Sequence, residues 1–164
     1  MDKSQMPMEA LLQILQDSLE KKIDLLGTIE EKSKEQEMII KKENFTFQEM
    51  DENMEEKSKL IEQLSLLDNG FETLYEKIRK ELLENKDQYR IQIEEIQNLI
   101  VEVTARGASI EAIEARNKAT IEAYFSREKK ELQKRKNVSS VARSYYQTAK
   151  QMNNVVPQFL DTKK

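Results

Sequence analysis

Apolar residues recur at every third or fourth position along almost the whole chain, which is the period of an amphipathic α-helix. The first apolar stripe follows Pro7, a residue that suits the first turn of a helix because an N–H there would have no intrahelical partner. This stripe predicts a helix over residues 8–43. Its members are Met8, Leu12, Leu15, Leu19, Leu26, Ile29 and Ile40.

The sequence Thr46-Phe47-Gln48-Glu49 predicts the start of a helix. A Thr followed three residues later by Glu fits a capping box, in which the Thr hydroxyl accepts the Glu amide and the Glu side chain reaches back to the Thr amide. Phe45 and Met50 flank this start as a hydrophobic staple. We therefore expect a turn near residues 43–45 and a second helix over residues 46–83. Its stripe is Met50, Met54, Ile61, Leu64, Leu67, Phe71, Leu74, Ile78 and Leu82.

The triplet Asp68-Asn69-Gly70 falls inside this second stripe and by itself predicts a turn. Either the helix continues through the triplet, with Gly70 costing about 1 kcal/mol relative to Ala, or it breaks and restarts. The stripe keeps its phase across the triplet, which favours a continuous helix.

A third helix is predicted over residues 87–136, after a turn at Glu84-Asn85-Lys86-Asp87 in which Asp87 serves as the N-cap. The stripe crosses Arg106-Gly107 roughly in phase, and no segment alternates as a strand would. Its members are Ile93, Ile96, Ile100, Val103, Ile110, Ile113, Asn117, Ile121 and Phe125. The fold class is therefore all-α, and residues 1–136 are expected to form an antiparallel, coiled-coil-like bundle of three long helices.

Residues 137–164 form a separate amphipathic C-terminal segment, expected to be short and helical or flexible. Ser and Asn residues weaken its helical propensity, and Pro157 ends any helix near Val156. Three alternatives are open: it packs on its own bundle as a fourth helix, it orders on a partner protein, or it lies on a membrane surface. Its apolar stripe supplies the candidate partner-binding residues, which are Val138, Val141, Tyr145, Met152, Val155 and Phe159.

The composition narrows the chemistry that is available to this chain. It has 164 residues and neither Cys nor His, which removes thiolate nucleophiles, imidazole acid–base catalysis and Cys/His metal sites. Three isolated Gly residues make no phosphate-binding loop. We expect a non-enzymatic protein without catalytic, cofactor-binding or metal-binding residues, and hence without a cofactor.

The charge is unevenly distributed, although the net charge of the whole chain is only −4. Residues 129–164 carry nine basic and two acidic side chains, a net charge of +7, which leaves −11 for residues 1–128. The acidic body disfavours nucleic acid as a partner. Neither a signal peptide nor a run of about 20 apolar residues is present in the sequence, so a cytoplasmic location is expected.

Several stretches of the sequence resemble the FlgN-type flagellar export chaperones. The resemblance runs from Leu11 onward, in the overall helical pattern and in a divergent form typical of Gram-positive bacteria. It is carried by KSKLIEQL, LLDNGFETLYEKIRKEL, IEAIEARNKATIEAYF, and YYQ followed by PQFLDTKK.

The resemblance implies a cytoplasmic helical protein that binds hook-filament junction proteins, prevents their premature assembly and presents them for type III export. Family members bind these clients largely through the C-terminal region, which here carries the stripe from Val138 to Phe159. Components of the export apparatus are implied as further partners, with membrane contact only indirect. The FliT-type chaperones of the filament cap protein are a sister class that the same pattern fits.

A structural protein is the alternative from a different class. Long apolar stripes also fit a coiled-coil tether or adaptor that self-associates through its helices, and homodimerisation is open under either hypothesis.

Overall fold

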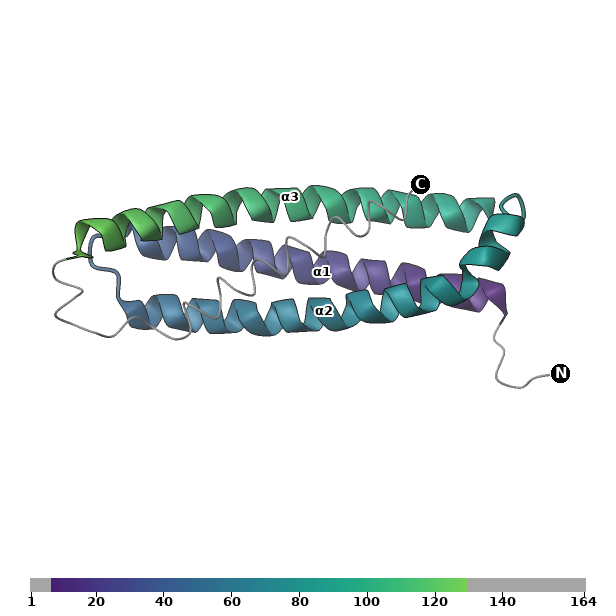
Figure 1. The fold of residues 1–164 in the computed structure, drawn as a ribbon, viewed down its shortest axis with the longest axis horizontal. Coiled ribbons are helices and arrows are strands. Elements are labelled where there is room, and N and C mark those ends of the chain that lie inside the picture. The colour runs from purple at the N-terminus through teal and green to yellow at the C-terminus, as the bar shows by residue number, and fades with distance from the viewer. Residues whose placement is uncertain (1–6, 130–164) are drawn as a thin grey trace.

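Three long helices make up the computed structural model, which describes residues 7–129 (Figure 1). They are α1 (Met8–Lys41), α2 (Phe47–Glu84) and α3 (Arg90–Arg127). The helices pack side by side into an elongated bundle, with α1 and α3 running in the same direction and α2 antiparallel to both. The predicted all-α fold with three long helices is confirmed.

The start of α2 shows the predicted Thr46 cap, whereas no hydrogen bond from the Thr46 amide to the Glu49 side chain is seen. The backbone N–H of Glu49 donates to the Thr46 hydroxyl at 3.2 Å, and Thr46 is the N-cap of the helix. Phe45 packs against a buried cluster that contains Met50, as a hydrophobic staple requires. The carboxylate of Glu49 pairs with Lys42 at 3.5 Å, which ties the helix start to the preceding turn.

Both glycines that interrupt the apolar stripes lie inside continuous helices. α2 runs through Asp68-Asn69-Gly70 and α3 runs through Arg106-Gly107 without a break. A side-chain carbon added at Gly70 would meet nothing within 4 Å. Of the two alternatives for the triplet, the continuous helix is therefore the observed one.

The predicted N-cap of the third helix is wrong. Asp87 lies within the turn, and α3 begins after Tyr89, which has no side-chain cap. The turn winds further than expected because the backbone N–H groups of Gln88 and Tyr89 both donate to the carbonyl of Asn85. This extra turn carries Tyr89 into the core, where its side chain is buried.

α1 is the central helix of the bundle. Its backbone lies against both α2 and α3, whereas α2 and α3 make no comparably close backbone contact anywhere in residues 7–129. Figure 1 shows α1 between its two neighbours along nearly the full length of the bundle. In residues 7–129, α2 and α3 are therefore each a backbone neighbour of α1 but not of each other.

The buried core consists of two apolar clusters at different heights of the bundle. The larger cluster extends from Met8 on α1 to Ile110 on α3, and the smaller one contains Ile40, Met50, Met54 and Ile121. Most residues of the predicted stripes are buried, while Leu67, Leu74, Ile93 and Phe125 are only half-buried.

Candidate functional site

The six partner-binding residues predicted from sequence lie outside the described residues. They are Val138, Val141, Tyr145, Met152, Val155 and Phe159, and the structure describes residues 7–129. The third helix was predicted to continue to residue 136, which is wrong: α3 ends at Arg127, and Glu128 is its C-cap. The site analysis therefore concerns the body of the bundle and the surfaces it offers.

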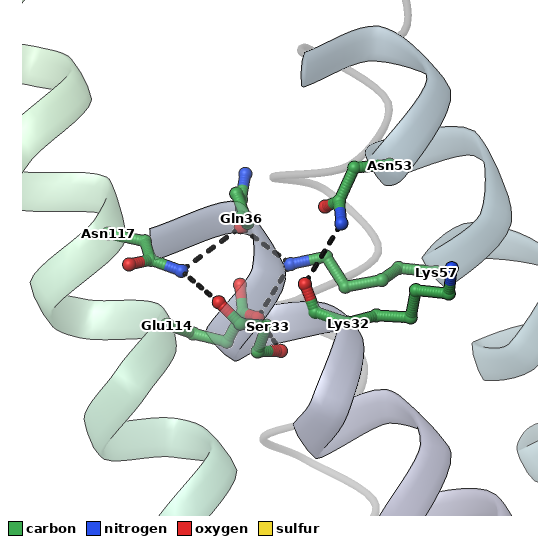
Figure 2. Close-up of polar contacts among 7 residues, drawn as sticks. All are labelled: Lys32, Ser33, Gln36, Asn53, Lys57, Glu114 and Asn117. Carbon is green, nitrogen blue, oxygen red and sulfur yellow. Dashed lines mark hydrogen bonds and ion pairs between the residues drawn. The ribbon is translucent and has the colours of Figure 1, made fainter. Parts of the chain in front are cut away.

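Between the two apolar clusters, all three helices contribute polar side chains to the core. We call this group the polar belt (Figure 2). Each member except Glu114 is fully buried or nearly so, and Glu114 is 11% exposed at its side chain. The belt consists of Ser33 and Gln36 from α1, Asn53 and Lys57 from α2, and Glu114 and Asn117 from α3.

Lys57 is the central residue of the belt. Its ammonium donates to Gln36 Oε1 at 2.6 Å and pairs with Glu114 Oε1 at 2.8 Å, so that one side chain of α2 binds both other helices. The Ser33 hydroxyl donates to the same carboxylate oxygen of Glu114. Because hydrogen bonds to charged groups are stronger than neutral ones, this group fixes the relative heights of the three helices.

Two amides complete the belt by binding carbonyl oxygens of α1. Asn117 Nδ2 donates to the Ser33 carbonyl at 2.9 Å and to Gln36 Oε1 at 3.2 Å, and Asn53 Nδ2 donates to the Lys32 carbonyl at 2.9 Å. The other side-chain atoms Gln36 Nε2, Asn53 Oδ1 and Asn117 Oδ1 are buried and have no hydrogen-bond partner among residues 7–129. The belt is thus polar on all three helices and incompletely satisfied.

Burial lowers the pKa of Lys57 to about 8, although the neighbouring Glu114 carboxylate favours the charged form. A lowered pKa of this kind is typical of lysines that act as catalytic amines. The Lys57 side chain is 0% exposed, however, and its ammonium is held between two side chains of other helices. Its geometry is that of a buried ion pair and not of an amine open to a substrate.

A second buried ion pair joins α1 to α2 within the larger apolar cluster. Lys22 Nζ lies 2.6 Å from Asp68 Oδ1, and both side chains are almost fully buried. Burial raises the pKa of Asp68 to about 6 and lowers the pKa of Lys22, because each charge has lost its water and only partly regains that stabilisation from its partner.

These polar core residues, apart from Asn117, were missed by the search for apolar stripes, although the sequence held a signal. In a repeat of seven, Lys22 stands three residues after Leu19 and four before Leu26, so it occupies a core position. Lys57 has the same spacing between Met54 and Ile61. Charged residues in the register of a stripe indicate buried pairs whose partners come from other helices.

The outer surface between α1 and α2 carries a shallow apolar groove. Leu66 is 72% exposed at its rim, beside the half-buried Leu25 and Leu67. The remaining lining is polar and comes from Lys21, Asp24, Thr28 and Gln63. An exposed leucine next to a groove is a surface on which another apolar side chain can be buried.

No cluster of three or more acidic side chains suited to a metal ion occurs in residues 7–129. Among the helices in that range, none combines the length and apolarity needed to cross a membrane. Comparison of the chain with protein-family models, with curated proteins and with solved structures found no match.

Proposed function

We propose that this protein is a cytoplasmic, non-enzymatic chaperone that binds flagellar hook-filament junction proteins before type III export and prevents their premature assembly. The proposal starts from the resemblance to FlgN-type chaperones in the segments LLDNGFETLYEKIRKEL and IEAIEARNKATIEAYF and in the C-terminal YYQ and PQFLDTKK. An all-α body agrees with it.

The observation that carries the proposal is the incomplete bundle. α1 has a neighbour on each side, whereas α2 and α3 do not contact each other closely, so one lateral side of the body is free of any described helix. Such a side accepts an amphipathic helix by helix-in-groove packing, which is a common way of binding helical assembly segments. Client binding by the C-terminal stripe covers apolar surfaces of the client that otherwise drive polymerisation.

Substitution of the stripe tests this role. In the full-length chain, Val141→Ser, Tyr145→Ser and Met152→Ser together are expected to abolish co-purification with hook-filament junction proteins. Ser144→Ala and Gln151→Ala, in the same segment but outside the stripe, serve as the matched control and are expected to retain it. Far-UV circular dichroism must show equal helix content in the bodies of both variants. Normal client binding by the stripe variant would disprove the proposed role of the stripe.

The exposed groove at Leu66 favours a second candidate, a coiled-coil tether that self-associates through its body. Light scattering separates the two functions, because a tether forms a stable elongated oligomer without a client. If Leu66→Ser converts such an oligomer into a monomer, the tether is the better description. A monomeric wild-type protein excludes this candidate.

A further inference from the structure

Each helix of the bundle has two flanks beside its buried row, and the contacts show which flanks are used. α1 uses both. Lys32 and Leu25 lie on its α2 side, where Lys32 pairs with Glu56, and Glu30 lies on its α3 side, where it binds Ser109. A central helix with both flanks occupied agrees with the backbone arrangement of Figure 1.

α2 and α3 each use only one flank for α1. On α2 this flank holds Asn53, which binds the Lys32 carbonyl, and on α3 it holds Arg106, which pairs with Glu30. The opposite flanks follow from the seven-residue repeat. They hold Ser58, Ser65 and Glu72 on α2, and Thr104, Glu111 and Lys118 on α3. We call the space between these two flanks the trough.

Apolar side chains next to the trough are buried. Met54 and Ile61 on α2 are 0% and 5% exposed, and Ile100 on α3 is 5% exposed. By the seven-residue repeat, all three lie on the trough side of their buried rows. Side chains of α2 and α3 meet across this side of the bundle at the Lys57–Glu114 ion pair, while the backbones of the two helices stay apart.

We propose that residues 137–156 of the same chain lie in the trough as a fourth helix that completes the bundle. Val138, Val141, Tyr145, Met152 and Val155 repeat at helical spacing, so they form one apolar face, and Pro157 ends the helix. This face turns inward, toward Met54 and Ile61, in the manner of the other three helices.

Chain length and direction permit this packing. α3 ends at Arg127, at the end of the bundle where α1 also ends and α2 begins, so residues 130–136 suffice for a turn back alongside α3. A helix of 20 residues extends about 30 Å, roughly half the length of α3. It therefore returns past the polar belt and covers the trough from that end to about the middle of the bundle.

Charge favours the chain's own segment as the occupant. Residues 130–164 hold eight basic and two acidic side chains, a net charge of +6, against 28 acidic and 18 basic side chains in residues 7–129, a net charge of −10. A second copy would bring another acidic body to the trough. The covalently attached basic segment also has a high effective concentration.

This packing concerns the protein without a client and does not depend on the identity of the client. The absence of native cysteine makes it directly testable by a cysteine scan in the full-length chain. One cysteine is placed on the trough flank of α3 by Glu111→Cys. A second is moved through residues 143–151 one position at a time. As the control, Ala112→Cys, on the exposed outer face of α3, replaces Glu111→Cys in the same scan.

After mild oxidation, intramolecular disulfides with Glu111→Cys are expected at positions three to four residues apart, as on one face of a helix, and the Ala112→Cys series is expected to give none. Amide hydrogen exchange in the unsubstituted protein must show residues 138–156 protected. Equal cross-linking in both series, or unprotected amides, would overturn the proposal. Intermolecular disulfides alone would assign the trough to a second copy instead. Loss of client binding in the stripe variant has no bearing on these outcomes.

Discussion

Lys57 on α2 and Glu114 on α3 form an ion pair of 2.8 Å in the interior, between two helices whose backbones make no close contact in residues 7–129. Like the stacked rings of Phe47 and Phe125, the pair connects α2 and α3 through side chains alone. Removing one partner should lower the free energy of unfolding more than breaking a surface pair does, because the remaining charge stays buried.

Glu114→Ala is expected to lower the free energy of unfolding by roughly 3–5 kcal/mol, since the Lys57 ammonium then lacks its carboxylate in a dry environment. Urea denaturation followed by circular dichroism measures the change. Glu122→Ala is the matched control on the same helix, because its pair with Lys118 is exposed, and it should cost at most about 1 kcal/mol. Similar losses for both variants would contradict a buried role for the pair.

Lys57 also predicts how stability depends on pH in the alkaline range. Its pKa is about 8 in the folded protein and 10.5 as the ordinary value, so between these pH values the unfolded chain binds more protons. Stability contributed by this residue therefore rises from about pH 8 to pH 10.5, by roughly 3 kcal/mol.

The measurement compares the unfolding free energy of wild type with that of Lys57→Met across this pH range, so that effects of other groups cancel. The difference should move in favour of wild type as the pH rises. Lys59→Met removes an exposed lysine of the same helix and should leave the wild-type pH profile unchanged. A flat difference for Lys57→Met would show that its pKa is not lowered.

Asp68 predicts the opposite slope under acidic conditions. Its pKa is raised from 3.8 to about 6, so between these values the folded protein binds more protons than the unfolded chain. Stability due to this carboxyl is fully present below about pH 4 and falls as the pH rises to 6, by roughly 3 kcal/mol. Asp68→Asn, measured by urea denaturation at pH 4 and 6.5, should lose this component. The exposed Asp24→Asn should keep it.

Gly70 offers a stabilising substitution. It lies inside α2 and is exposed, and an added Cβ meets no atom within 4 Å. Gly70→Ala is therefore expected to raise the free energy of unfolding by about 0.5–1 kcal/mol, because alanine loses less backbone entropy in a helix. Thermal unfolding provides the measurement, with the exposed Ser65→Ala on the same helix as the reference. Destabilisation by Gly70→Ala would mean that the helix is strained or broken at the Asp68-Asn69-Gly70 triplet.

The helices could be predicted from the sequence because their signals are local. Apolar spacing placed the helix ends within about three residues, except the end of α3, which is at Arg127 and not at residue 136, and the Thr46 cap needs only residues three positions apart. The start of α3 was misplaced at Asp87 because the turn continues through backbone hydrogen bonds to the Asn85 carbonyl. Side-chain patterns in the sequence do not indicate such bonds.

The polar belt could not be assembled from sequence for the converse reason. Ser33 and Glu114 are 81 residues apart, and Lys57 and Glu114 are 57 apart. A charged residue at a core position of a helix is stable only when a residue of another helix pairs with it. Which residue that is depends on how the helices are shifted along one another. Asn117 alone was placed in a stripe from its spacing, while the hydrogen bonds that bury it required the structure.

The central place of α1 has a consequence for biosynthesis. The ribosome releases α1 first, yet its apolar row has no neighbour until α2 and then α3 have been made. Since the backbone of each later helix lies against α1, the α1–α2 hairpin can form before α3 leaves the exit tunnel, and α3 can then dock on α1 and meet α2 through side chains such as Glu114. The order of synthesis thus matches an order of assembly in which every step adds one helix to a template that already exists.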